Sequence, residues 1–285
     1  MQYIKPKNIQ ELNTLLQAYG NKVQILAGGT DLLVEDRYHG SRRKEIKIDL
    51  AAISGLKNIR EEDDKICIGP MVTHSKIIRN RLINKYAPVL AQACRVIGSI
   101  QIRNRGTIGG NICNASPCAD SIPALMVLEA RLVIGSINGE QIIPIGEFFL
   151  KPYKTILKPG YWLKEIRIRK TQSGEKCAFI KLGRRNALAI SRMNFAVIMK
   201  INSGNIIEYV RLVPGSVFPI WRRISEVEEY LKGNRISEEL FETAGNMVSE
   251  LMIKTSGRRW STPYKEPVVA ALTTRALSQA AGMLD

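Results

Sequence analysis

Two glycine-rich turns constrain this chain more than any other feature of its sequence. The first, "AGGTDLLV" (residues 27–34), directly follows the apolar run "KVQIL", and the second lies in "RNRGTIGGN" (residues 103–111). Glycine has no Cβ and adopts positive φ easily, so another group can approach such a turn closely. Successive exposed N–H groups also form a concave nest that binds an anion such as phosphate. Both turns are therefore candidate anion-binding sites.

Two nests that follow two strands in neighbouring lobes would hold one diphosphate from both sides. In the first turn Thr30 adds a hydroxyl donor, and Asp31 is expected to cap the segment that follows. The spacing is not G-x-G-x-x-G, so a Rossmann dinucleotide site is not indicated. On this reading a valine at Gly110 would occupy the place of the diphosphate and abolish its binding. Two unrelated structural turns stay open as the alternative.

Polar side chains accompany the second turn and extend beyond it. Thr107 and Asn111 flank its glycines. Asn111, Ser116 and Asp120 suit a ribose or another polyol, because a sugar hydroxyl can donate to a carboxylate and also accept. The residues thus favour a dinucleotide ligand but do not name it.

The pattern of apolar residues predicts an α+β chain in three parts. Residues 1–55 read as a helix over 9–19, capped by Asn8, and two strands in "KVQIL" and "EIKIDL". The second part, residues 56–172, contains hairpins, short helices and a closing strand in "YWLKEIRIRK". The third part, residues 173–285, has three strands followed by helices at about 225–232, 237–253 and 263–283.

Composition narrows the class of protein. The net charge of +16 attracts polyanions, but the basic residues are dispersed and have no interleaved aromatic pattern, so we expect no nucleic-acid binding. Five cysteines, an odd number, fit a reducing compartment, and the Cys113–Cys118 pair lacks the second pair that a metal site needs. We find no apolar run of ~20 residues and no signal peptide, so we expect a soluble cytoplasmic protein.

Three segments together resemble one family. They are "ILAGGTDLLV", "GSIQIRNRGTIGGNICNASPCADSIPAL" and "FIKLGRRNALAISR". In this order and spacing they look like the successive signatures of the FAD-binding (medium) subunits of molybdenum hydroxylases, and the resemblance covers essentially the whole chain. Within the family, "QIRN…GGNICN" is most similar to xanthine-dehydrogenase-type subunits.

The resemblance implies a fold and a set of ligand contacts. The fold would be a two-lobed FAD-binding domain of the vanillyl-alcohol-oxidase (PCMH) type, with lobes 1–55 and 56–172, followed by a smaller α+β domain. Residues 27–31 and 106–111 would cradle the FAD pyrophosphate, and Lys181 would lie near the flavin ring. The residues and the resemblance together nominate these cofactor-binding residues: Gln24, Ile25, Leu26, Ala27, Gly28, Gly29, Thr30, Asp31, Gly106, Thr107, Ile108, Gly109, Gly110, Asn111, Ser116, Asp120, Trp162, Leu163, Ile180 and Lys181.

The family also implies a function shared between chains. Substrate hydroxylation would take place at a molybdenum cofactor in a large partner subunit, and a small [2Fe–2S] subunit would pass the electrons to the FAD held here. NAD⁺ or another acceptor would then receive them. The assembly would be a dimer of heterotrimers, and this chain would hold neither a metal nor a catalytic residue.

Two departures and two rival functions qualify this reading. Ile180 stands where many relatives have an aromatic residue, and the cysteine-rich insertion of hydroxybenzoyl-CoA-reducing relatives is missing. Carbon monoxide, aldehyde and nicotinate dehydrogenases stay open as alternatives to a xanthine-type enzyme. A stand-alone flavin reductase on the same scaffold and a basic nucleic-acid-binding module are the rivals.

Overall fold

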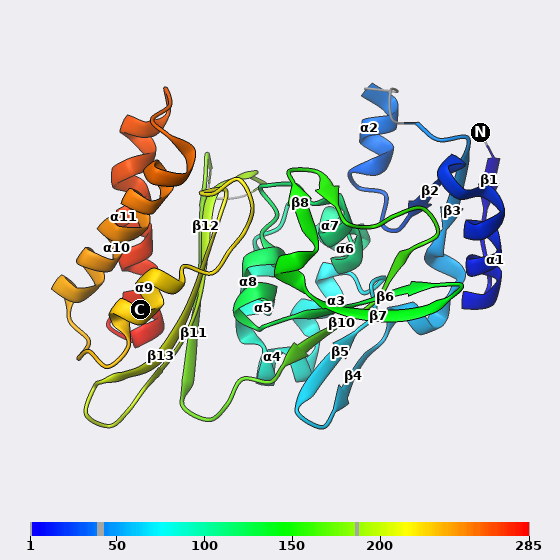
Figure 1. Ribbon diagram of the computed structural model, residues 1–285. Helices are drawn as coiled ribbons and strands as arrows, with labels where there is room; N and C mark the ends of the chain where they lie inside the picture. Colours follow the sequence, from blue (N-terminus) through cyan, green and yellow to red (C-terminus); the bar gives the residue numbers. More distant parts are fainter. Residues whose placement is uncertain (1, 39–42, 186–187, 285) are drawn as a thin grey trace.

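The computed structural model describes residues 2–38, 43–185 and 188–284 and shows three β-sheets along the long axis of the molecule (Figure 1). The first sheet is parallel in the order β1-β3-β2. Its elements are β1 (Gln2–Ile4), α1 (Ile9–Tyr19), β2 (Val23–Leu26), α2 (Leu32–Tyr38) and β3 (Ile46–Asp49).

The predicted helix of the first lobe is confirmed. The Asn8 side chain accepts a hydrogen bond from Glu11 N at 2.9 Å, and Gly20 ends α1 with φ 49°. Leu12 and Leu16 lie on its buried face against β3. The sequence analysis missed two elements: strand β1, which pairs with β3, and helix α2, which lies in the connection between the two predicted strands. The reason for the second miss is physical, because α2 has no buried residue and hence no strong apolar period.

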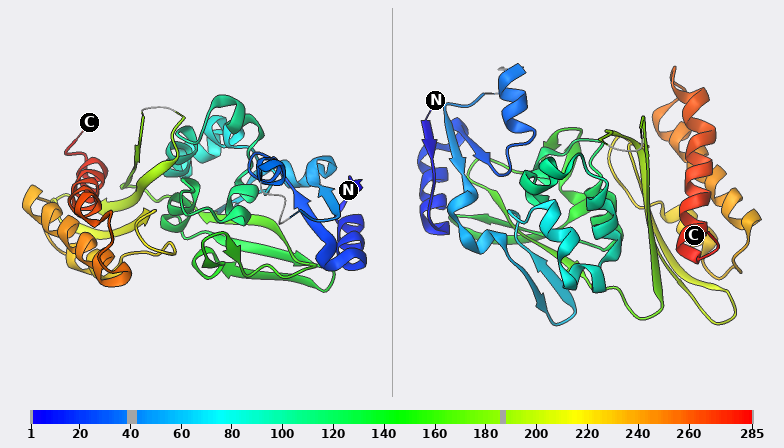
Figure 2. Two further views of the ribbon diagram at one scale, coloured as in Figure 1. Left: turned by 90° about the horizontal axis from the view of Figure 1, so that it is seen from above. Right: turned by 180° about the vertical axis from the view of Figure 1, so that it is seen from behind.

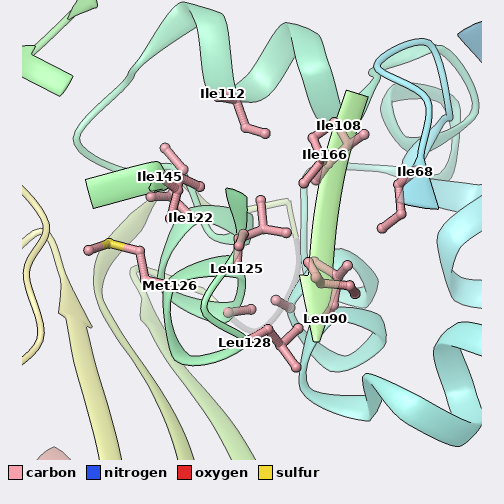
Figure 3. Packing of buried hydrophobic residues seen from close by; sticks show 14 of the residues in the cluster. Ile68, Leu90, Ile108, Ile112, Ile122, Leu125, Met126, Leu128, Ile145 and Ile166 are labelled. Atoms are coloured by element: carbon pink, nitrogen blue, oxygen red, sulfur yellow. The ribbon is translucent and has the colours of Figure 1, made fainter. Parts of the chain in front are cut away.

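The second lobe is a five-stranded antiparallel sheet in the order β4-β5-β10-β6-β7, covered by short helices. Ile66, Ile68, Ile166 and Leu132 point from alternate sheet positions into one core with helix residues such as Leu90, Ile108 and Leu125 (Figure 3). Its strands are β4 (Ile59–Glu62), β5 (Lys65–Ile68), β6 (Arg131–Ser136), β7 (Gly139–Pro144) and β10 (Trp162–Arg169), with the small pair β8 (Phe149–Lys151) and β9 (Lys154–Thr155). Its helices are α3 (His74–Arg79), α4 (Arg81–Tyr86), α5 (Pro88–Arg95), α6 (Ile100–Arg105), α7 (Ile108–Asn114) and α8 (Ser121–Val127).

The third sheet is antiparallel in the order β11-β12-β13 and lies between two helical layers (Figures 1 and 2). On β12, Phe195 and Val197 face the C-terminal helices, whereas Ala196 and Ile198 belong to the core of the second lobe. Both faces of this strand are therefore buried, which binds the C-terminal part to the second lobe. The elements are β11 (Glu175–Gly183), β12 (Ser191–Ile201), β13 (Ile207–Gly215), α9 (Ser225–Leu231), α10 (Glu238–Ser256) and α11 (Thr262–Ala281).

Trp162 joins the first two lobes. It begins β10 in the second sheet but is buried in the core of the first lobe. Its indole Nε1 donates to Asn13 Oδ1 on α1 at 3.0 Å. Trp162 is part of a strand of the second lobe, but its side chain packs in the core of the first lobe. This contact fixes how the two lobes meet.

Candidate functional site

A cleft of about 360 Å³ lies where the two lobes meet. A cleft of this size between lobes is a usual place for a cofactor. It is formed by the carboxyl end of β2, the segment after β5, the start of α7 and the start of β10. Most of the nominated residues line it, namely Gln24, Ile25, Ala27, Gly28, Gly29, Thr30, Asp31, Gly106, Thr107, Gly109, Gly110, Asn111, Trp162 and Leu163.

The two glycine turns pack directly against each other. A Cβ on Gly28 would lie 2.1 Å from the carbonyl oxygen of Arg105, so only glycine allows this approach. Gly29 has φ +77°, as the first turn requires. The bare backbone of the first turn thus accommodates the second turn, not only a ligand.

The first turn offers unpaired donors to the cleft. In the described chain, the N–H groups of Gly28, Gly29 and Thr30 donate to no protein acceptor. The carbonyl of Gly29 accepts from Leu33 N at 3.1 Å and the carbonyl of Asp31 from Glu35 N at 2.9 Å, which starts helix α2. A row of free N–H groups at the wall of a cleft is the chemistry that binds phosphate oxygens.

The second turn differs from the prediction. It follows helix α6 rather than a strand, and it forms the first turn of α7, capped by the Thr107 hydroxyl. Its N–H groups are already bonded: Ile108 N to Val72 O at 2.9 Å, Gly109 N to Pro70 O at 2.9 Å, and Gly110 N to Thr107 Oγ1 at 3.1 Å. The expectation of a second nest is therefore wrong, because the helix start and the neighbouring loop use its donors.

The reason expected for Gly110 changes as well. A Cβ at this position would meet Thr107 Oγ1 at 2.9 Å and the Cβ of Ala27 at 3.5 Å, not the open cleft. A larger side chain would displace the cap of α7. The space beside Gly110 is therefore taken up by the contact between the two turns.

Asn111, in helix α7, is a polar residue that lines the cleft. Its Oδ1 accepts from the buried Ser121 Oγ at 2.6 Å, which fixes the orientation of the amide. Among the described residues, its Nδ2 has no protein acceptor, so it is a donor held ready for a ligand.

Six nominated residues do not line the cleft. Leu26 and Ile108 are buried behind it, and the Ser116 hydroxyl donates to Tyr153 OH at 3.4 Å. Asp120, Ile180 and Lys181 lie where α8 meets the third sheet.

Asp120 and Lys181 form a buried ion pair in this junction. Lys181 Nζ donates to Asp120 Oδ2 at 2.7 Å and to Val96 O at 2.9 Å, while Asn194 Nδ2 donates to Asp120 Oδ1 at 2.9 Å. Burial raises the pKa of Asp120, and the Lys181 ammonium and the Asn194 amide oppose that shift. Both carboxylate oxygens thus already have protein donors, which differs from the expected role toward a polyol.

Two further residues of functional interest, His74 and Lys47, were not among the predicted site residues. His74 lines the cleft, 2 % exposed, with Nδ1 3.5 Å from Cys94 Sγ. Burial, with a smaller contribution from Arg103, lowers the pKa of His74 to about 4, so the ring is neutral at pH 7. The Thr73 hydroxyl caps α3, where it accepts a hydrogen bond from Lys76 N at 3.2 Å.

Lys47 contacts both elements that flank the first turn, strand β2 and helix α2. It is 1 % exposed on β3, its Nζ donates to Gln24 Oε1 at 2.7 Å, and it pairs with the carboxylate of Asp36 on α2. No local sequence pattern predicts that Lys47 is buried, because the alternation of residues in a strand indicates burial only for the apolar ones. Lys47 is buried because β3 is the central strand of a parallel sheet, which only the tertiary fold determines.

Other cleft residues were also absent from the nomination. Leu50 follows β3, Pro70 and Met71 follow β5, and Tyr153 lies in the β8–β9 turn. A signal existed for Leu50, because β2 and β3 are parallel neighbours and the residues that follow them lie at the same sheet edge. Among the described residues no group of three or more His, Cys, Asp or Glu side chains could hold a metal ion, and no helix there is long and apolar enough to cross a bilayer.

Fold and cleft together define a two-lobed protein with a cleft between its lobes that is suited to an anionic ligand, followed by a third α+β layer. A family model described as the FAD binding domain in molybdopterin dehydrogenase matches residues 1–170, and one described as the CO dehydrogenase flavoprotein C-terminal domain matches residues 178–280. The chain therefore belongs to the FAD-carrying subunits of the molybdenum hydroxylases, which are oxidoreductases.

Relatives agree along the whole length. The carbon monoxide dehydrogenase medium chain of Hydrogenophaga pseudoflava is 30% identical over 279 residues, covering 98% of this chain and 96% of that one. A putative xanthine dehydrogenase FAD-binding subunit of Escherichia coli (strain K12) is 29% identical over 269 residues, covering 93% and 91%. The solved carbon monoxide dehydrogenase from Hydrogenophaga pseudoflava matches with a TM-score of 0.91 at 29% identity, covering 98% and 96%. Identities this close do not separate the substrate classes.

Proposed function

We propose that this chain is the electron-relay subunit of a heteromeric molybdenum hydroxylase and that it binds FAD in the cleft between its lobes. The observation that carries the site is the row of unpaired N–H groups at Gly28, Gly29 and Thr30 on the cleft wall. The diphosphate of FAD is the anion for this row. Asn111 Nδ2 and the Thr107 hydroxyl supply further donors from the opposite side.

The remaining nominated residues have supporting roles in this proposal. Leu26 and Ile108 are packed behind the two turns and fix their separation. Trp162 and Leu163 line the cleft by the start of β10, where the lobes are joined. Lys181 and Asp120 lock the third sheet to α8 and Ile180 flanks them, and the bond from Lys181 to Val96 O holds the segment of Ile97, which lines the cleft.

The chemistry of the proposal belongs to the cofactor. FAD supplies one- and two-electron redox chemistry when bound, and the protein supplies position, electrostatics and exclusion of water. The neutral ring of His74 and the apolar side chains of Met71 and Leu163 form an uncharged part of the cleft wall. No side chain of this chain is required as a general base.

The finer assignments follow the sequence signatures. Electrons would come from [2Fe–2S] clusters of a small partner, which receives them from a molybdenum cofactor in a large partner, and NAD⁺ would accept them. The substrate class proposed first is the xanthine type, in a dimer of heterotrimers in the cytoplasm, with the lobes divided at residues 55 and 172.

Expression with the partner chains tests this function. The purified assembly should carry one FAD per copy of this chain, and substrate should bleach the flavin absorption near 450 nm until NAD⁺ restores it. A chain that purifies alone and reduces its substrate with NADPH would instead support the stand-alone flavin reductase. A colourless assembly would contradict the proposal.

A further inference from the structure

A pair of arginine-rich loops at one end of the third sheet exposes an unusual side chain. Trp260 is 96% exposed in the connection between α10 and α11, and Ile190, at the start of β12, is 79% exposed. Trp is seldom left so open on a monomer and is enriched among residues that dominate protein interfaces. Its exposure therefore needs a partner.

A cation–π contact places the two loops side by side. The Arg192 guanidinium lies 5.2 Å from the centre of the Tyr264 ring, and Gly183, Arg184, Arg192 and Tyr264 line one shallow hollow. Figure 1 shows the connections β11–β12 and α10–α11 at the same end of this layer. We define the aromatic–arginine surface by six residues: Ile190, Arg192, Arg258, Arg259, Trp260 and Tyr264.

The charge of this surface selects the kind of partner. It carries three arginines, and the described ion pairs give only one of them an acidic partner, namely Arg258 with Glu266 at 3.1 Å. Arginine and tryptophan together favour a protein surface that offers carboxylates around an apolar pocket.

The aromatic–arginine surface is also connected to the buried Asp120–Lys181 pair. Arg192 follows Ser191, whose hydroxyl accepts from Asn194 Nδ2 at 3.3 Å, and the same Nδ2 donates to Asp120. A partner seated here would lie next to the junction of Asp120 and Lys181. We propose that the aromatic–arginine surface docks an acidic face of a partner subunit, with Trp260 as the anchor; this inference rests on the proposed function.

Charge and anchor are tested separately in the co-expressed assembly. We expect Trp260→Ala to weaken assembly at least tenfold, measured as the dilution at which the complex dissociates. The charge reversal R258E/R259E should also weaken assembly. Added salt should weaken assembly of the unchanged protein, because it screens the same arginines. FAD content should stay that of the unchanged chain in both variants, because neither site lines the cleft.

Matched controls are Ile137→Ser, an exposed apolar residue in the β6–β7 turn, and K232E/R235E after α9. Unaltered assembly of both Trp260→Ala and R258E/R259E would overturn the inference, as would an equal loss in the controls. Salt-sensitive retention on DNA that R258E/R259E abolishes would overturn it in favour of nucleic acid. Failure of the unchanged chain to bind any partner would instead contradict the proposed function.

Discussion

Lys181 Nζ lies 2.7 Å from Asp120 Oδ2, and this bond joins β11 of the third sheet to the start of α8. The two side chains are 10% and 6% exposed, so neither charge can turn to solvent without its partner. Asn194 and Val96 complete the polar shell. The junction between α8 and the third sheet is therefore held by a satisfied buried pair.

Removal of the lysine should be strongly destabilising. Lys181→Met leaves the Asp120 carboxylate buried without its cation, and we expect a loss of about 3–5 kcal/mol in the free energy of unfolding. The control is Lys200→Met, since the Lys200–Glu208 pair at 2.8 Å is about a third exposed and should be worth less than ~1 kcal/mol. Urea unfolding measures both; equal losses would refute the buried role.

The contact between the glycine turns makes a second prediction. Gly28→Ala forces a Cβ against the Arg105 carbonyl, so the turns must separate and FAD should be lost during gel filtration. Gly55→Ala is the control, because nothing lies within 4 Å of the added methyl. The ratio of absorbance at 450 nm to that at 280 nm reports retention. Full flavin in the Gly28 variant would show that the contact is dispensable.

The orientation of Asn111 makes a third. Asn111→Ala should raise the Kd for FAD about fivefold, since loss of one hydrogen bond is worth about 1 kcal/mol and a tenfold change corresponds to ~1.4 kcal/mol. Ser121→Ala, which removes only the bond that fixes the amide, should have a smaller effect in the same direction. Fluorescence titration of the apoprotein measures both. An unchanged Kd in the Asn111 variant would exclude the amide from the site.

His74 makes stability depend on pH. Its pKa is about 4 in the folded chain against 6.5 as a free side chain, so between these pH values the unfolded chain binds a proton that the folded chain does not. The free energy of unfolding should therefore fall as pH drops from about 6.5 toward 4, by about 3 kcal/mol from this group. His74→Gln should lack this component. Parallel curves for the two proteins between pH 4 and 7 would contradict the assignment.

Much of the fold and part of the site were predictable from local patterns. The Asn8 cap and the three strands with three helices at the end of the chain follow from periodicity and turn chemistry. The first glycine turn was placed correctly after β2, because a short buried strand followed by Gly28 and Gly29 has few other structures available.

The tertiary structure decided what those residues face. Gly28 is bare for the Arg105 carbonyl, the N–H groups of α7 are used by Pro70 and Val72, and Lys47 is buried beneath the first turn. Each of these contacts joins residues more than 20 positions apart, so no local propensity encodes it. The sequence determined which segments have a bare backbone or a buried face; only packing decided which donors stay free for a ligand, because a hydrogen bond depends on where its acceptor lies.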